Sequence, residues 1–427
     1  MRKLTVKGRY LFWDNGEPFF YLADTAWELF HRADREEAEY YFSQRARQGF
    51  NVVQIVALAE FDGLFQPNAY GRIPLKFDNG RPDPEIPDTD GEYSYWHHVD
   101  YIIGLAAKYN IFVSLLPTWG DKFNIAHGKG PEIFNERNAY IYGKWIAERY
   151  KDYENIIWML GGDRGLDNPF HRSVIDSMAK GICEVDKNHL ITFHPPGNKT
   201  SLDYLADAEY IDFHTAQTGH GVGQCYATDS VVLEMADRTA KPYMDSEPRY
   251  EDHPACFDEN IGYYWDDADI RQNAYWNLTA GVCGHTYGNH CIWSMNKEPS
   301  KYYPYNWREA LLHKGAEQMI HLRNLRLSHD FESLRPCNEI LCNNYDGMGH
   351  ITAAKGTNYA YIYTPLGLPF NANLGCFNNA QRLKASWFDP RNGNVEVLGI
   401  LPANGINTFA PPTQGKGNDW LLIIETV

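Results

Sequence analysis

Short apolar runs recur between residues 19 and 287 and alternate with longer stretches of helical periodicity. Each run has five or six residues and is nearly continuous in hydrophobicity. This pattern is typical of strands that are buried on both faces of a parallel sheet. The predicted strands are Phe19–Ala23, Val52–Ala57, Ile111–Leu116, Ile156–Leu160, Leu190–His194, Tyr210–His214, Pro242–Ser246 and Val282–Tyr287.

Amphipathic segments between these runs predict helices, because apolar residues return there at helical spacing. Asp34 and Glu37 have the spacing of a capping box, and Gly49 stands where a helix would end. Eight strands alternating with helices predict an α/β fold, the (β/α)₈ TIM barrel. The clearest predicted helices are Arg35–Gln48, Tyr95–Tyr109, Glu136–Tyr150 and Asn306–Leu327.

Two irregular segments belong to this predicted barrel. Arg9–Phe20 has the pattern of a β-hairpin around Asp14-Asn15-Gly16, and we expect it to plug the lower end of the barrel. Glu60–Glu92 is a long loop rich in Pro, Gly and Asp, placed on the rim after the second strand. Loops of that length in compact domains are usually functional, so we expect this one to shape the site.

The pattern changes after residue 330 to short strand-like runs separated by turns. We therefore predict two domains: a barrel with its N-terminal hairpin over 1–330, and a small all-β sandwich over 331–427. We expect the sandwich to dock on the barrel. Its clearest predicted strands are Tyr359–Tyr363, Lys384–Phe388 and Trp420–Ile424.

Composition excludes several classes of function. The chain has 39 Lys+Arg against 55 Asp+Glu, a net charge of −16, which argues against a nucleic-acid partner. No apolar run approaches the roughly 20 residues of a membrane span. The eight cysteines lack Cys-x-x-Cys spacing, so we expect buried free thiols. We expect a periplasmic or extracellular bacterial location, with any signal peptide outside this sequence; the oligomeric state stays open.

Two carboxylates stand out among the polar residues at the predicted strand ends. Asp163 follows the fourth strand and Glu247 the seventh, which face each other across a barrel mouth. Glycoside hydrolysis needs one carboxyl to protonate the leaving oxygen and a second to attack the sugar or activate water. An Asp at a strand end also caps helices, whereas Glu247 before Pro248 is harder to explain in that way. Glu60 ends the second strand.

Four segments together resemble the apiosidase-like family, which is glycoside hydrolase family one hundred and forty and its relatives. They are LADTAWELF (22–30), IIWMLGGDR (156–164), DSEPRYE (245–251) and WFDPRNG (387–393). This family is similar to the retaining barrel clan of the family 5 cellulases. The resemblance implies a retaining mechanism with Asp163 as acid/base and Glu247 as nucleophile, and cleavage at apiose in a pectin side chain. The clan usually has Asn-Glu where this chain has Gly162-Asp163, which shortens the acid.

Other strand-end residues are expected to bind the carbohydrate substrate. Asp24 would hold a hydroxyl, and Trp119 and Trp293 would stack on sugar rings. His214 and Tyr287 would donate hydrogen bonds to Glu247 or bind hydroxyls. The glycines before Asp163 would let backbone and substrate approach closely, and Arg164 would point away from Asp163 if the segment is extended. The remaining predicted substrate-binding residues are Trp27, Asp121, His194 and Gln217.

No cofactor is expected. The histidines near strand ends (194, 214, 285 and 290) show neither His-x-His nor His-Glu-x-x-His spacing, so we expect no metal site. The sequence thus predicts a retaining glycoside hydrolase of plant cell-wall, apiose-containing pectic saccharides. A cellulase-like endo-glycosidase, a carbohydrate-binding pseudoenzyme, an inverting hydrolase with Asp245 or Asp121 as base, and a metal hydrolase are the alternatives. The sugar, the linkage and endo or exo action stay open.

Overall fold

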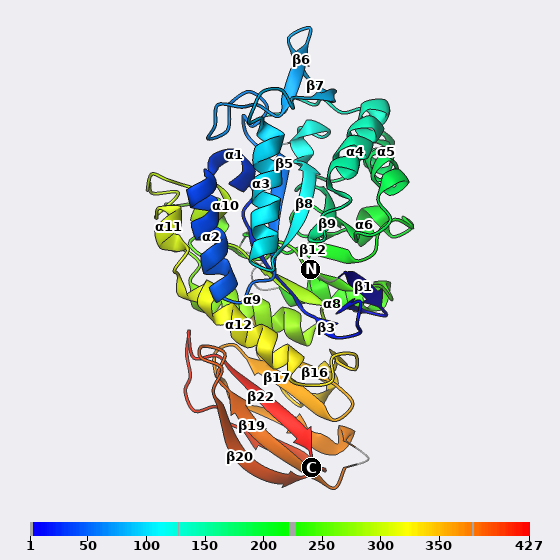
Figure 1. Ribbon diagram of the computed structural model, residues 1–427. Helices are drawn as coiled ribbons and strands as arrows, with labels where there is room; N and C mark the ends of the chain where they lie inside the picture. The colour runs from blue at the N-terminus through cyan, green and yellow to red at the C-terminus, as the bar shows by residue number, and fades with distance from the viewer. Residues whose placement is uncertain (1–2, 127, 222–227, 378–379) are drawn as a thin grey trace.

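The computed structural model describes residues 3–126, 128–221, 228–377 and 380–427 (Figure 1). Within them, eight parallel strands form a barrel, which confirms the predicted TIM barrel. Between its fifth and sixth strands, the backbone N–H of Asp212 donates to the carbonyl of Ile191 at 2.8 Å. The strands are β4 (Tyr21–Thr25), β5 (Val52–Leu58), β8 (Phe112–Thr118), β9 (Ile156–Gly161), β10 (Ile191–His194), β12 (His214–Gln217), β13 (Tyr243–Asp245) and β14 (Gly284–Tyr287). A short strand, β11 (Lys199–Thr200), pairs antiparallel with β12.

The sixth barrel strand is shifted from its prediction. The run Tyr210–His214 was expected to be extended, but β12 starts at His214. The side chain of Asp212 accepts a hydrogen bond from the Ile191 backbone at 2.8 Å, which fixes a bend before the strand. Ile211 and Phe213 are buried there, so the run is apolar because it packs in the core and not because it is a strand.

Helices α2 (Arg35–Arg47), α3 (Tyr95–Lys108) and α4 (Glu136–Tyr150) confirm three predictions, and the capping box of Asp34 and Glu37 is present. The predicted last helix is divided into two, because the carbonyl of Leu311 accepts from Gln48 Nε2 at 2.9 Å instead of continuing the helix. The other helices are α1 (Leu29–Arg32), α5 (Pro169–Val185), α6 (Leu202–Leu205), α8 (Thr228–Arg238), α9 (Asp267–Thr279), α10 (His290–Trp293), α11 (Trp307–Ala310) and α12 (Lys314–Leu327).

The N-terminal hairpin closes one end of the barrel, as predicted. It is part of a three-stranded sheet of β1 (Leu4–Lys7), β2 (Tyr10–Trp13) and β3 (Pro18–Phe19). The rings of Trp13 and Phe19 lie 5.8 and 5.7 Å from that of Phe112, the first residue of β8. The hairpin therefore covers the amino ends of the strands and leaves the carboxyl ends free for chemistry.

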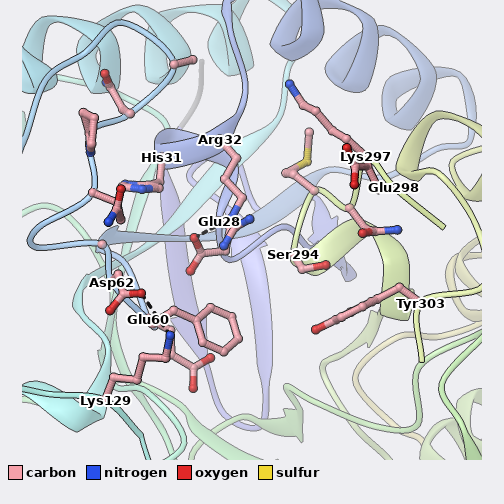
Figure 2. Close-up of a pocket in the computed structure, with 18 residues that line it drawn as sticks. Glu28, His31, Arg32, Glu60, Asp62, Lys129, Ser294, Lys297, Glu298 and Tyr303 are labelled. Carbon is pink, nitrogen blue, oxygen red and sulfur yellow. Dashed lines mark hydrogen bonds and ion pairs between the residues drawn. The ribbon is translucent and has the colours of Figure 1, made fainter. Parts of the chain in front are cut away.

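The long rim loop contains a hairpin that the sequence did not predict. Strands β6 (Leu75–Asp78) and β7 (Arg81–Pro87) pair around Asn79 and Gly80, whose φ angles of 46° and 79° suit a tight turn. The first part of the loop, residues 60–69, lines a pocket together with Glu28 and Tyr303 (Figure 2). This placement agrees with the expected functional role of the loop.

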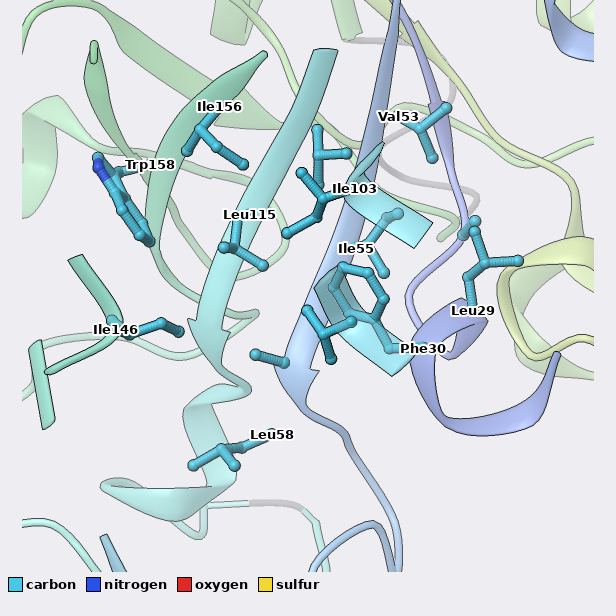
Figure 3. Close-up of a cluster of buried hydrophobic side chains, with 14 of the residues drawn as sticks. Leu29, Phe30, Val53, Ile55, Leu58, Ile103, Leu115, Ile146, Ile156 and Trp158 are labelled. Atoms are coloured by element: carbon cyan, nitrogen blue, oxygen red, sulfur yellow. The ribbon is translucent and has the colours of Figure 1, made fainter. Parts of the chain in front are cut away.

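Apolar side chains on the outer faces of the strands pack against the surrounding helices (Figure 3). Ile55 of β5, Leu115 of β8 and Trp158 of β9 are fully buried, as are Ile103 of α3 and Ile146 of α4. Full burial of each such side chain contributes about 1.5–3 kcal/mol. This shell holds the strand ends in fixed positions around the barrel mouth.

The C-terminal domain is a sandwich of unequal layers. A sheet of six strands carries a second layer of two strands, and the Phe370 ring contacts that of Trp387 between them at 6.2 Å. Arg271 of α9 pairs with Asp419 at 2.8 Å, so the domain docks on the barrel as expected. Figure 1 shows it at the end of the molecule opposite to β6 and β7. Its strands are β15 (Arg335–Pro336), β16 (Thr352–Lys355), β17 (Tyr359–Thr364), β18 (Phe370–Asn373), β19 (Arg382–Phe388), β20 (Val395–Pro402), β21 (Ile406–Phe409) and β22 (Trp420–Thr426).

Every cysteine in the described part of the chain is a free thiol, and Cys225 lies outside the described residues. Burial is confirmed for Cys283, Cys291 and Cys337, but Cys342 is exposed and the other described cysteines are half-buried. Across the described residues, no group of three or more His, Cys, Asp or Glu side chains is arranged to hold a metal ion. None of the described helices has the length and apolar character to cross a membrane.

Candidate active site

A cavity of about 570 Å³ opens at the carboxyl ends of the barrel strands, and we call it the carboxylate cavity. Asp163, two residues after β9, and Glu247, two residues after β13, both line it. The structure thus brings the two predicted catalytic carboxylates to one space. Four predicted substrate-binding residues also line this cavity: Trp27, Trp119, Gln217 and Trp293.

Glu247 is buried between two histidines. His220 Nε2 lies 3.0 Å from its Oε1, and His194 Nε2 lies 2.9 Å from its Oε2. Burial alone would raise the pKa of Glu247, but the two imidazoles outweigh it and hold that pKa well below its usual range. Glu247 is therefore an ionised carboxylate, the form that attacks an electrophilic carbon.

His194 connects the two carboxylate segments. Its Nδ1 accepts a hydrogen bond from the backbone N–H of Asp163 at 3.2 Å, so the neutral ring carries its proton on Nε2, facing Glu247. The side chain is fully buried and is absent from the cavity lining. The sequence predicted that His194 binds substrate. The structure instead places it behind the cavity wall, where it contacts both Glu247 and the backbone of Asp163.

The glycine pair before Asp163 allows the close backbone approach that the sequence predicted. Gly161, Gly162 and Asp163 have φ angles of 92°, 108° and 58°, so three consecutive residues are left-handed. A Cβ on Gly161 would lie 2.5 Å from the His194 carbonyl oxygen, and one on Gly162 would lie 2.7 Å from the Gly120 nitrogen. The glycines therefore allow backbone segments of neighbouring strands to pass closely, and the close approach of substrate stays a prediction.

This turn also brings Arg164 back to Asp163. The Arg164 Nη1 atom lies 2.8 Å from Asp163 Oδ2 and 2.7 Å from the Asp163 carbonyl oxygen. The expectation that Arg164 points away is wrong, because side chains alternate only in extended backbone. The Asp163 side chain is 25% exposed, while that of Arg164 is buried. The Asp163 carboxylate thus lies at the cavity surface and pairs with the buried guanidinium group of Arg164.

A third carboxyl, Glu60, lines the same cavity. Burial, and then the negative charge of Asp163, raise the pKa of Glu60 to about 8. Glu60 is therefore protonated at neutral pH beside Asp163. The sequence predicted that Glu60 ends the second strand. It could not predict that Glu60 lies near Asp163, because only the closed barrel brings these two strand ends to one cavity.

Two acidic residues expected to bind substrate lie outside the cavity. Asp24 is fully buried and accepts hydrogen bonds from Arg45 at 2.7 Å and Tyr41 at 2.5 Å. Asp121, also fully buried, pairs with Lys122 at 2.6 Å and accepts from the Gly130 backbone at 3.0 Å. The structure gives these carboxylates internal partners instead of sugar hydroxyls.

His214 and Tyr287 do not support Glu247, so that expectation is wrong. His214 Nδ1 lies 2.9 Å from Ser201 Oγ, and Tyr287 donates to Glu251 Oε2 at 2.6 Å. Both side chains are buried and neither lines the cavity. Tyr287 ends β14, whereas His214 begins β12 and therefore lies at the end of its strand away from the cavity.

Asp245, the alternative base, also has its hydrogen-bond partners inside the protein. Its oxygens accept from Thr218 Oγ1 at 2.6 Å, Asn277 Nδ2 at 3.2 Å and the Glu247 backbone at 3.2 Å. Asp245 is fully buried and absent from the cavity lining, as is Asp121. The inverting alternatives that use either residue therefore lack a base that can reach water in the cavity.

Aromatic side chains cover much of the cavity wall. Trp27 and Trp119 lie 5.3 Å apart, and Phe61 stacks on Trp293 at 5.7 Å. In the described structure, Trp119 Nε1 and the buried Nε2 of His290 have no hydrogen-bond partner, as expected where a hydroxyl-rich ligand binds. Sequence reasoning missed further lining residues, because they lie on loops without a local signal: His220, Tyr250, His253, Phe257, Tyr302 and Tyr303.

Two family models match consecutive parts of the chain. Residues 5–333 match "Apiosidase-like, catalytic domain", and residues 336–425 match "Putative collagen-binding domain of a collagenase". No curated protein matches the chain.

Solved structures agree with the first of these models. One described as "Glycoside hydrolase" is 33% identical with a TM-score of 0.89, over 100% of this chain and 97% of that chain. A family 5 glycoside hydrolase from Bacteroides vulgatus is 32% identical with a TM-score of 0.89, over 99% of this chain and 93% of that chain. An endo-1,4-beta-mannanase from Rhizomucor miehei, 14% identical with a TM-score of 0.50 over 74% of this chain and 99% of that chain, shares the fold alone.

Proposed function

Because the chain belongs to the apiosidase-like family of glycoside hydrolases, we propose that it cleaves a glycosidic bond with retention of configuration in the carboxylate cavity. One observation carries this proposal. Glu247, held ionised between His194 and His220, shares a cavity with Asp163. An anionic nucleophile and a second carboxyl in the same space are the two groups that a double displacement requires.

The reaction follows from these positions. A carboxylate oxygen of Glu247 bonds to the anomeric carbon while the bond to the leaving oxygen breaks, and the Asp163 carboxyl gives its proton to that oxygen. Asp163 then removes a proton from water, whose oxygen displaces Glu247 and restores both carboxyls. His194 and His220 orient Glu247 through the contacts to its two oxygens.

The substrate that we propose is an apiose-containing pectic saccharide of the plant cell wall. The support is the family match over residues 5–333 and the four segments that resemble this family. A cellulase-like endo-glycosidase and a carbohydrate-binding pseudoenzyme are the alternatives.

A screen of pectic and hemicellulosic oligosaccharides tests the proposal. We expect cleavage of an apiose-containing pectic fragment by the wild type, and NMR of the first product should show retained anomeric configuration. An inverted product would overturn the retaining mechanism, and cleavage confined to β-1,4-glucans would favour the cellulase-like alternative. Binding without cleavage of any oligosaccharide would identify a pseudoenzyme.

A further inference from the structure

A second cavity, of about 740 Å³, lies beside the carboxylate cavity, and we call it the rim pocket (Figure 2). Its walls come from α1 and the residue before it, from residues 60–69 of the rim loop, from Lys129, and from residues 294–298. Glu60, Phe61 and Tyr303 line both cavities. The two cavities are therefore adjacent, with these three residues between them.

Three buried side chains that line the rim pocket carry polar atoms without a hydrogen-bond partner in the described structure. These atoms are Glu28 Oε1, His31 Nδ1 and Asn68 Nδ2. Their residues are only 1%, 7% and 5% exposed. A buried polar atom without a hydrogen bond costs about 1–3 kcal/mol, so three of them around one pocket indicate a ligand that completes them.

The same side chains are held in place by their other atoms. Glu28 Oε2 accepts from Arg32 Nε at 3.0 Å. Asn68 Oδ1 accepts from the backbone N–H groups of Tyr70 and Arg72 at 2.9 and 3.1 Å. The unpartnered atoms therefore have fixed positions, as the groups of a preorganised binding site do.

The charges of the rim pocket favour a neutral ligand. The lining cations all have acidic partners: Arg32 pairs with Glu28, Lys129 with Asp62 at 3.0 Å, and Lys297 with Glu37 at 2.7 Å. Burial lowers the pKa of His31 to about 4, so this side chain is neutral at physiological pH. A ligand carboxylate would find no uncompensated cation among these lining residues.

We propose that the rim pocket is a second subsite that binds a neutral sugar unit of the saccharide chain cleaved in the carboxylate cavity. Hydroxyl groups both donate and accept hydrogen bonds, so they satisfy the Glu28 oxygen and the Asn68 amide alike. Phe61 lines both cavities and stacks on Trp293, so an apolar surface lies between them. This inference rests on the proposed function in one respect, namely that the substrate is a saccharide of more than one unit.

The sharpest test is Asn68→Asp, which keeps the Oδ1 acceptor for Tyr70 and Arg72 and replaces the unpartnered donor with an acceptor. Asn168→Asp is a control for the change from amide to carboxylate, because its Oδ1 also accepts a backbone N–H, that of His171 at 2.9 Å, and it lines neither cavity; Asn168 is exposed, whereas Asn68 is buried, so thermal unfolding of both variants is compared as well. Both variants are made in the Glu247→Gln protein to prevent turnover. The probes are immobilised oligosaccharides of the plant cell wall, one set containing neutral sugars and one set of oligogalacturonates.

We expect the protein with Asn168→Asp to retain its affinity for the neutral-sugar set, and the protein with Asn68→Asp to lose at least tenfold. Equal binding by both would overturn the subsite, as would binding confined to oligogalacturonates or binding of no oligosaccharide. If thermal unfolding shows that Asn68→Asp is misfolded, the isosteric Glu28→Gln takes its place with the same expectation. Hydrolysis by the wild type is measured separately: loss of binding in Asn68→Asp without any wild-type cleavage would refute the proposed function and leave the subsite standing.

Discussion

The two carboxylates at the barrel mouth stand in opposite surroundings. At the end of β13, Glu247 is buried, and both of its oxygens face histidine nitrogens. At the end of β9, the Asp163 side chain is 25% exposed, is supported by Arg164, and lies near the protonated Glu60. One side of the site therefore stabilises a negative charge, and the other holds a carboxyl proton on Glu60, beside Asp163.

The proposed acid and the proposed nucleophile are both carboxyl groups, but the two roles require different surroundings. A nucleophile must stay ionised throughout the pH range of activity, whereas the acid side must hold and return a proton. The burial of Glu247 is compensated by two imidazoles, while the partly exposed side chain of Asp163 opens to the cavity. The geometry thus supports assigning the roles in this order and not in reverse.

Replacement of the nucleophile should have the largest effect. Glu247→Gln keeps the shape but removes the charge, so we expect kcat to fall by about 10⁴-fold or more. The histidine contacts no longer stabilise an anion, but the fold should persist, as checked by circular dichroism. Retention of more than a tenth of wild-type kcat would contradict the role of Glu247.

Replacement of the acid should have a smaller effect that depends on the leaving group. Asp163→Asn removes the proton donor, and we expect kcat/KM to fall by about 10²–10⁴-fold for oligosaccharides with a poor leaving group. An aryl glycoside of the same sugar, whose phenolate leaves without protonation, should be affected much less in glycosylation. Equal losses for both kinds of substrate would show that Asp163 is not the acid.

Much of the fold was predictable from the sequence, because buried strands and capped helices leave local signals. The capping box at Asp34 and the apolar runs of β5, β8 and β9 each fix an element without reference to the rest of the chain. The shifted β12 and the break before α12 were not predictable in this way. Both depend on hydrogen bonds between distant segments: the Ile191 backbone donates to the Asp212 side chain, and the Gln48 side chain donates to the Leu311 carbonyl.

The sequence predicted which end of the barrel Asp163 and Glu247 share, but it did not predict the contacts of the surrounding side chains. Asp163 and Glu247 line the cavity because each closely follows a parallel strand. Which strand-end side chains turn inward depends on backbone details: Asp24 and Tyr287 found partners outside the cavity, and the left-handed Asp163 brought Arg164 back. His220 had no local signal, since its role depends on its contact with Glu247.

His194 offers a way to sharpen the comparison, because it touches both sides of the site. His194→Phe removes one of the contacts that lower the pKa of Glu247, so that pKa should rise. The proposed mechanism requires ionised Glu247, so the acid limb of kcat/KM should move to higher pH. The lost contact should also lower kcat/KM at neutral pH by about 10- to 100-fold. His214→Phe is the matched control, since His214 is as deeply placed but contacts Ser201. An unshifted acid limb in His194→Phe would contradict the proposed support of Glu247.

The smallest expected effect concerns stability at the Asp163 side. The pKa of Glu60 is about 8 in the folded protein against an ordinary value of 4.5, so the folded state binds this proton more tightly than the unfolded state. Glu60 therefore contributes stability below pH 4.5 that is lost as the pH rises towards 8. Glu60→Gln removes this loss, and its urea midpoint should exceed that of the wild type at pH 8 but not at pH 4. Because the charge of Asp163 is one cause of the raised pKa, the advantage of Glu60→Gln should shrink in an Asp163→Asn background. An advantage of equal size in both backgrounds would show that the two carboxyls do not interact.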